Sequence, residues 1–433
     1  MKKFLFIIIL ICVVQTLFAQ EKLTLQQAIE TGLKNNYSII IAKNESEMAK
    51  NNATLGNAGM LPQINLGLTQ NNSVTDTKQK YSTGSEVNRT GATSNSLNAY
   101  AALDWTIFDG FKMFAAYNKL KELNTLGDLQ ARQIIENTVS EIISAYFDIV
   151  KQQALLTVID TAQKISAVKL NIAKTKFNIG SSSKVEYLQA QVDMNAGISS
   201  YKKQQITIDA SKVNLNKLLA RDVSLEYEVA DSIEINYNPT YEDLKAKAGK
   251  DNTSLQIAQR NITISGLTIK ELRAERFPVI GLNGSYDYSK STSQANFVLE
   301  NRTTGFNYGF TATYNLFNGF TLNKRIKNAK LDLENSNINF NSAQTEVNAE
   351  LIIAFKNFEN NLELLQMEES NGNLAKENVD LSLERFKVGA IDQLQLKEAQ
   401  QSYVEAQNRL VNARFDTKIA ETGLKKLAGE LLK

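Results

Sequence analysis

The side chains that most often carry enzyme chemistry are almost absent from this chain. Its 433 residues include no histidine and one cysteine, Cys12, which excludes a Ser-His-Asp triad, a histidine general base and a histidine metal site. Carboxylate pairs remain possible, but the Asp and Glu residues are scattered at helical spacing and indicate no convergent cleft. No phosphate-binding loop or other nucleotide motif occurs. We therefore expect no catalytic site, no cofactor and no bound metal.

The N-terminus predicts export from the cytoplasm. Lys2 and Lys3 precede the apolar run FLFIIILICVV, which is too short to span a bilayer, and Ala19 follows at a plausible cleavage point. A buried N-terminal strand or helix is the alternative. Cleavage of a signal peptide, residues 1–19, would remove Cys12 and leave 46 basic residues (48 − 2) against 46 acidic ones, so neither disulfides nor nucleic-acid binding is expected. No later apolar stretch looks long enough for a membrane helix, so membrane contact must use strands.

The rest of the chain consists of two copies of one unit. Pro62 and Pro278, which lie 216 residues apart (278 − 62), each separate a helical pattern from a strictly alternating one. The motif WTIFDGF at 105–111 recurs 209 residues later (314 − 105) as YNLFNGF at 314–320. Such a duplication predicts a repeated supersecondary unit. We assign the first copy to 20–238 and the second to 239–433.

Each copy contains two alternating segments about as long as a membrane strand. In the first segment Ile64, Leu66 and Leu68 alternate with polar residues. A sheet packed on a protein core is the usual interpretation, but the segment length and the Trp and Tyr residues on the apolar faces favour lipid. The polar stretch after the first segment is expected to be a long exposed hairpin loop. The predicted strands are 62–70, 97–108, 278–288 and 305–317.

After each aromatic motif the pattern becomes helical. Residues 111–177 contain no proline and one glycine, which predicts about 100 Å of helix. Val139, Ile142 and Tyr146 belong to one of two adjacent apolar seams, which require neighbours on both sides; a wall of helices and a plain bundle both satisfy this. Glycine in F-x-x-G, at Gly180 and Gly389, stops each long helix. The predicted helical hairpins are about 110–219 and about 319–428.

The two aromatic motifs mark the junctions where a strand ends and a long helix begins. Trp105 and Tyr314 suit a lipid–water boundary, and Gly110 and Gly319 allow the backbone to bend. The Asp or Asn before each glycine could cap the helix or simply occupy a turn. Each chain would supply four membrane strands. Four strands cannot close a barrel and an open edge is not tolerated in lipid, so several chains must share one barrel.

The order of these elements, repeated twice, resembles the TolC-type outer-membrane efflux protein family over essentially the whole mature chain. The likeness includes the opening LTLQQAIETGLKNN, the FDG and FNG junctions, the F-x-x-G tips and the LNKLLARD ending of the first copy. The resemblance implies an α+β membrane protein, a homotrimer with a shared twelve-stranded β-barrel in outer-membrane lipid and a periplasmic α-helical barrel. It also implies two partners, a periplasmic membrane-fusion adaptor and an inner-membrane pump.

The resemblance also suggests where such a channel narrows. In that family, acidic residues six and nine places after the tip glycine constrict the periplasmic mouth. The same count in this chain gives the candidate constriction residues Glu186, Gln189, Gln395 and Glu398. Gln395 departs from the family's usual Asp, which leaves the strength of a cation-binding constriction open. Nearby basic residues could link neighbouring helices in a closed state, and for all seven a solvated helix surface is the alternative; these candidate gate links are Lys184, Arg385 and Lys397.

We expect a passive outer-membrane exit duct of a tripartite efflux or type I secretion system, gated at its periplasmic helical tips. A periplasmic coiled-coil scaffold or adaptor without a channel is the alternative, and it would lack lipid-facing strands. An outer-membrane enzyme ranks last for the reasons given above. The sequence does not discriminate among small toxic compounds, metal ions and polypeptide as the cargo.

Overall fold

The structure, a computed structural model, describes residues 21–229, 232–294 and 298–432, so the predicted signal peptide lies outside the described residues. The chain forms two compact units, and each unit draws on both sequence copies. The first, here called the helical unit, contains residues up to Glu45, 129–257 and from Asn341 onward. The second, the sheet unit, contains 46–128 and 258–340.

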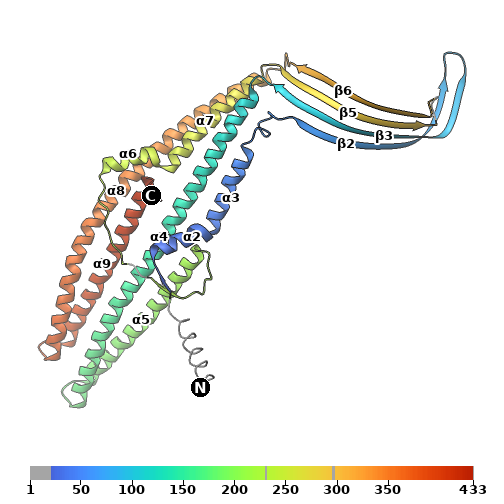
Figure 1. The fold of residues 1–433 in the computed structure, drawn as a ribbon. Helices are drawn as coiled ribbons and strands as arrows, with labels where there is room; N and C mark the ends of the chain where they lie inside the picture. Colours follow the sequence, from blue (N-terminus) through green and yellow to red (C-terminus); the bar gives the residue numbers. More distant parts are fainter. Residues whose placement is uncertain (1–20, 230–231, 295–297, 433) are drawn as a thin grey trace, which may run out of the picture. The chain divides into compact units, whose positions relative to one another are not determined.

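Four antiparallel strands in the order β2–β3–β5–β6 dominate the sheet unit (Figure 1). They are β2 (Gln63–Lys80), β3 (Glu86–Phe108), β5 (Val279–Ser293) and β6 (Glu300–Thr313). The register aligns apolar residues across the sheet, since Leu66 pairs with Ala101, Ala101 with Tyr286, and Tyr286 with Phe306. Because alternate residues point to opposite faces, the predicted alternation produces one apolar face and one polar face.

The first hairpin is longer than predicted. The stretch expected to be a loop continues the antiparallel ladder as far as the pair of Lys80 and Glu86, and a tight turn at 81–85 joins the strands. Its Ser, Thr and Asn residues are polar on both faces, which is typical of a loop but equally permits a solvated two-stranded ribbon held by backbone hydrogen bonds. The strand β5 likewise continues past the predicted end at 288, to Ser293.

The last strand is shorter than the predicted 305–317. The strand β6 ends at Thr313, so Tyr314 lies outside it. Thr313 pairs with Val279, which is the first residue of β5. Because β6 is an edge strand whose partner in this chain is β5, no residues of β5 remain to pair with 314–317.

Two helical hairpins of equal size follow the two strand pairs. The helices α4 (Lys112–Asn178) and α8 (Thr321–Lys387) have 67 residues each, and α5 (Lys184–Leu218) and α9 (Gln393–Leu427) have 35 each. Within the helical unit, α5 lies beside α4 and α9 beside α8 (Figure 1). The shorter elements are α2 (Leu25–Asn35), α3 (Tyr37–Asn52), α6 (Tyr241–Asp251), α7 (Thr253–Ala274) and the parallel pair β1 (Glu21–Leu23) and β4 (Tyr227–Val229).

The duplication extends to single hydrogen bonds. The Asn36 side chain donates to the carbonyl of Leu218 at 2.7 Å and accepts from the amides of Ser38 and Ile39, at the start of α3. Asn252, at the equivalent position (36 + 216), donates to the carbonyl of Leu427 (218 + 209) at 3.0 Å. Asn252 also accepts from the first amides of α7. Each asparagine thus starts one helix and fastens it to the end of a hairpin.

Both predicted apolar seams of α4 are buried. Val139, Ile142 and Tyr146 are at most 1% exposed and pack with α2 and α5 in the main core cluster, which also takes Ile143 and Phe147 from the second seam. One 18-residue window of α4 is apolar enough to cross a membrane, contrary to our expectation that no such stretch exists. Such a window is weak evidence for a membrane helix, and the buried residues of α4 belong to the main core cluster.

Replacing either asparagine cap tests the repeated link. Asn36→Ala and Asn252→Ala should each lower the free energy of unfolding by about 1–2 kcal/mol, because helix amides and a buried carbonyl lose their partners. Asn44→Ala, on the exposed surface of α3, should change it by less than about 0.5 kcal/mol. Denaturant unfolding followed by circular dichroism measures all three. Equal losses in the three variants would contradict the capping role.

Candidate functional site

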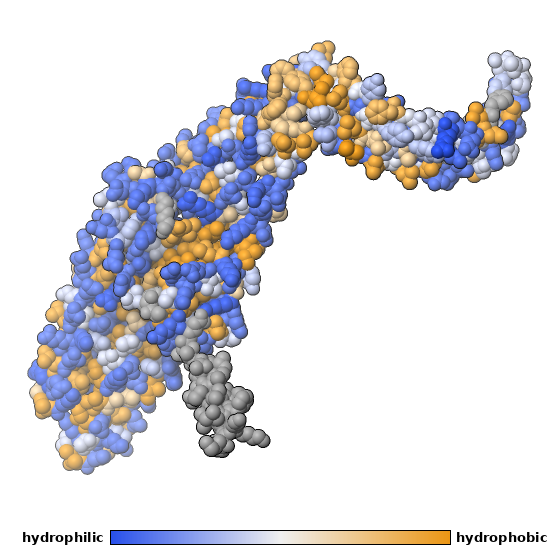
Figure 2. Space-filling view, viewed as in Figure 1, coloured by the Kyte–Doolittle hydropathy of each residue, from blue (hydrophilic) through white to orange (hydrophobic). Residues whose placement is uncertain are grey.

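The apolar face of the sheet unit carries large side chains that none of the described residues covers. Leu66, Tyr308 and Phe310 are 82%, 80% and 75% exposed. Six more exposed side chains share the face: Ile64, Leu68, Trp105, Leu282, Tyr286 and Phe306. Keeping all nine in water would cost roughly 14–27 kcal/mol at 1.5–3 kcal/mol each, which equals or exceeds the stability of a typical domain, about 5–15 kcal/mol. Figure 2 shows apolar residues gathered over the strands next to the helices, and polar residues towards the far hairpin tip.

The opposite face of the sheet is polar and internally hydrogen bonded. Asp287 accepts from the hydroxyl of Ser285 at 2.5 Å and from the amide of Asn307 at 2.8 Å. Asp104 and Asp287 are the charged residues on this face along the rows that back the apolar side chains. Such a surface suits contact with water, so the sheet separates an apolar environment from an aqueous one.

Each strand–helix junction is a turn with two successive residues in the left-handed region. Gly110 and Phe111 have φ of 71° and 68°, and Gly319 and Phe320 have 64° and 62°. The glycines were expected there, but a phenylalanine rarely adopts positive φ. In each copy this phenylalanine packs edge-on against the one three residues earlier, with ring centroids 5.4 Å apart. Because the same strained backbone conformation occurs in both copies, we interpret the turn as a defined structural feature and not as an irregularity.

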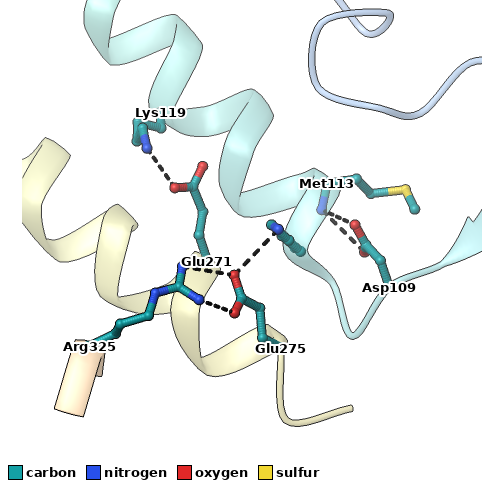
Figure 3. Close-up of polar contacts among 7 residues, drawn as sticks. Asp109, Met113, Lys119, Glu271, Glu275 and Arg325 are labelled. Atoms are coloured by element: carbon teal, nitrogen blue, oxygen red, sulfur yellow. Dashed lines mark hydrogen bonds and ion pairs between the residues drawn. The ribbon is translucent and has the colours of Figure 1, made fainter. Parts of the chain in front are cut away.

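Polar contacts hold the first junction against the end of α7 (Figure 3). The Asp109 carboxylate accepts from the amide of Met113 at 2.9 Å, so it caps α4, one of the two roles considered for it. Glu275 accepts a bidentate pair from Arg325 of α8, at 2.6 and 3.2 Å, and contacts Lys112 of α4 at 3.5 Å. One carboxylate at the end of α7 therefore joins the starts of both long helices.

The hairpin tips are built alike. Gly180 and Gly389 have φ of 74° and 77°, and the residue after each donates its amide to a carbonyl five positions earlier, as in a Schellman motif. Ser183 and Asp392 then cap the return helices α5 and α9. Among the residues that the structure describes, no three Asp or Glu side chains gather as a metal site would require.

The four candidate constriction residues lie in the first turns of the return helices. Glu186 accepts from the hydroxyl of Ser182, and Gln395 completes a capping box with Asp392. Gln189 donates to Asp193 at 3.0 Å, and Glu398 is exposed on α9. The structure therefore gives Glu186, Gln189 and Gln395 local partners, whereas the Glu398 side chain stands open at the surface.

One candidate gate link joins the two hairpins. Lys397 of α9 lies 3.2 Å from the carboxylate of Asp193 on α5, and Lys169 of α4, whose side chain is 1% exposed, binds the other oxygen at 2.5 Å. In the part of the chain that the structure describes, Lys184 and Arg385 are exposed and form no ion pair. The sequence did not lead us to predict Lys169 or Asp193 as part of this site. A lysine four residues from both Ile165 and Ala173, on a buried face, was the available signal.

The electrostatics of this cluster favour the charged carboxylate. Burial alone would raise the pKa of Asp193, but hydrogen bonds from Lys169 and Gln189 and the charge of Lys169 outweigh it, so the pKa lies below its ordinary value. The cluster borders a cavity of about 380 Å³ between the two hairpins. Across the same cavity, the Gln400 amide of α9 donates to the Ala162 carbonyl and the Ser166 hydroxyl of α4, at 2.7 and 2.9 Å.

A model of the outer membrane efflux protein family matches residues 28–221 and 246–430. The chain belongs to this family. The protein is therefore placed in the outer membrane, with its helical part extending into the periplasm, and the resemblance found in the sequence is confirmed. No curated protein sequence matches the chain.

Solved structures share the fold at low sequence identity. The CmeC outer membrane channel of Campylobacter jejuni has a TM-score of 0.80 and 14% identity, over 94% of this chain and 86% of that one. The outer membrane protein VceC of Vibrio cholerae has a TM-score of 0.73 and 15% identity, over 94% of this chain and 96% of that one. The open state of the MtrE outer membrane channel of Neisseria gonorrhoeae has a TM-score of 0.75 and 16% identity, over 94% of this chain and 89% of that one.

The close approach at Gly110 can be tested with a matched glycine. A Cβ at Gly110 would lie 2.4 Å from the carbonyl oxygen of Ala274, whereas Gly84, also at positive φ, has open space around it. Gly84→Ala should lower the free energy of unfolding by about 1–2 kcal/mol, from backbone strain alone. Gly110→Ala should cost about 1–3 kcal/mol more, from overpacking. Denaturant titration in detergent measures both, and equal losses would rule out the packing constraint.

The Asp193 cluster has a defined pH dependence. Because the pKa of Asp193 is lowered in the folded state, its contribution to stability is present above about pH 4 and is lost as the pH falls through the folded pKa. Asp193→Asn should therefore destabilise the protein by about 3 kcal/mol near pH 7, with a smaller difference from wild type near pH 3. Asp160→Asn, which breaks an exposed pair with Lys164, should cost less than about 1 kcal/mol. A difference from wild type that is the same at both pH values would exclude the carboxylate charge as the cause.

Proposed function

We propose that this protein is a passive exit duct of the outer membrane, built from three copies and gated at its periplasmic helical tips. The exposed apolar face of the sheet carries the proposal. Its nine large side chains need a lipid environment, while the polar face behind them, with Asp104 and Asp287, suits an aqueous lumen. We also propose that residues 1–19 are removed on export.

The edges of the sheet support a barrel shared between chains. The strands β2 and β6 each pair with one neighbour in this chain, so each has a free edge. Lipid offers no hydrogen-bond partner to an open edge, and closure with copies of the same chain satisfies both edges. Any closed ring of copies meets this requirement. The number three, and with it a barrel of twelve strands, rests on the family resemblance.

The gate of the duct is assigned to the hairpin tips around Gly180 and Gly389. In this proposal, Glu186, Gln189, Gln395 and Glu398 surround the periplasmic mouth, and dilation requires the two hairpins of each copy to separate. The Lys397–Asp193–Lys169 cluster opposes that separation because it ties α9 to α4 and α5. Lys184 and Arg385, which are exposed and form no ion pair with the described residues, are available to neighbouring copies. The lowered pKa of Asp193 extends the charged state of this link to more acidic pH.

The energy for transport is assigned to other proteins. The chain has no nucleotide-binding motif, so an inner-membrane pump, joined through a periplasmic membrane-fusion adaptor, would drive export. These partners, and a role in tripartite efflux or type I secretion, rest on family membership. A periplasmic scaffold without a channel is disfavoured because it would leave the apolar face in water.

Single-channel conductance tests the duct and its constriction together. Purified protein in a planar bilayer should give stable openings, and Glu398→Ala should change their conductance because a charge at the constriction is removed. Glu377→Ala, on the exposed surface of α8, is the matched control and should conduct like wild type. Openings unaffected by Glu398→Ala would keep the duct but move its constriction elsewhere. Protein that extracts without detergent and never conducts would support the scaffold.

A further inference from the structure

We propose that Lys290 and Arg302 form a binding site for the phosphate of an outer-leaflet lipid, on the lipid-facing surface of the sheet. The two residues are directly opposed in the antiparallel register of β5 and β6. They follow the apolar rows on the same face, since Lys290 is two residues beyond Tyr288 and Arg302 is two before Thr304. The site depends on the place of the sheet in the outer membrane, and not on conductance or gating.

The height of the pair on the sheet matches the outer boundary of the lipid. Because the helices extend into the periplasm, the junction ends of the strands are the inner ends. Leu282, paired with Trp105, lies in the second apolar row from the junctions, after Ile280, and Lys290 follows eight residues later (290 − 282). At about 3.4 Å per residue this is about 27 Å along the strand, or about 21 Å along the membrane normal for a tilt near 40°. The apolar band of such sheets is about 25 Å tall, so the pair lies near lipid headgroups.

The pattern of charge on this face supports a phosphate ligand. Between the junction end and Lys290, the described rows of the lipid-facing surface contain no charged side chain. The first charges met are two cations, Lys290 and Arg302, together with Glu300 one row farther out. The group therefore carries one net positive charge at headgroup height, where a basic residue costs little and a lipid phosphate is within reach.

The contacts of the two cations leave them able to bind a phosphate. The Arg302 guanidinium lies over the ring of Tyr288, 5.2 Å from its centroid, which orients its planar fork. Among the described residues, no carboxylate forms an ion pair with it. The Lys290 ammonium is 3.3 Å from Glu300, but both side chains of this pair are about half exposed. An exposed pair of this kind is worth about 0–1 kcal/mol, so an incoming phosphate competes readily for the ammonium. The fork of Arg302 then supplies two parallel hydrogen bonds.

Lipid binding to the purified full-length protein tests the site. Native mass spectrometry from detergent micelles would count the molecules of phosphatidylglycerol, an anionic lipid with a phosphate, and of diacylglycerol, which has no phosphate, bound per chain. The double variant Lys290→Gln/Arg302→Gln should bind the anionic phosphate-bearing lipid about 10-fold or more weakly, and its binding of the phosphate-free diacylglycerol should be unchanged. Lys80→Gln is the matched control, because Lys80 is an exposed lysine paired with Glu86 at the far end of the hairpin, and it should stay within about 2-fold of wild type.

A third variant and a competition experiment test the site further. Arg302→Lys keeps the charge and removes the fork, so it should bind with intermediate affinity even if the double variant folds poorly. Inorganic phosphate at millimolar concentration should not displace the lipid, since the site also uses the acyl-chain surface over Tyr286 and Tyr288. Equal anionic-lipid affinity in the double variant and wild type would overturn the site. Displacement by inorganic phosphate alone would overturn a lipid as its ligand.

Discussion

Backbone hydrogen bonding in lipid is the constraint on which the rest of this structure depends. A four-stranded sheet with one apolar face cannot lie in water, because nine large side chains would be hydrated, and cannot stand alone in lipid, because its edges would be unsatisfied. A single chain therefore carries only part of the surface that its environment demands. The strands end in strained turns at Gly110 and Gly319, where the sheet stops and the long helices begin.

Duplication solves the same local problems twice but does not make the two copies equal. Asn36 and Asn252 fasten equivalent helices to equivalent hairpin ends with the same set of hydrogen bonds. The junctions differ, because Gly110 packs against the end of α7, whereas Gly319 has open space around it in the single chain. Glu275 adds to the asymmetry by joining the starts of α4 and α8. Equivalent positions thus meet different neighbours in the two copies.

The polar cluster between the hairpins differs in kind from the apolar packing around it. Apolar side chains such as Val379, Leu396 and Tyr403 bury apolar surface, and this interaction has no preferred direction. The ion pairs of Lys169 and Lys397, in contrast, require Asp193 at a fixed distance and angle. Removing one member of such a cluster leaves a charge without its partner, so the cluster favours one arrangement of the helices over sliding alternatives. Together with the bonds of Gln400, it makes this part of the bundle specific as well as stable.

Features that follow a repeating pattern along the chain could be predicted from the sequence alone. The duplication, the alternating strands, the paired seams of α4 and the glycine turns at Gly110, Gly180, Gly319 and Gly389 all follow from local period and local backbone freedom. The ribbon at 71–96 was mistaken for a loop, because polar residues on both faces give no period that distinguishes a solvated strand from a turn.

The remaining features needed the tertiary structure, since they depend on which neighbour a residue meets. The strand β6 stops at Thr313 because its partner β5 begins at Val279. Phe111 and Phe320 adopt positive φ although their residue type argues against it, so the residue types alone did not indicate this conformation. Among seven candidate residues near the tips, only contact geometry distinguished Lys397 as a link, and only burial identified Lys169 and Asp193. Sequence determined the elements, and their contacts decided where those elements end and which charges meet.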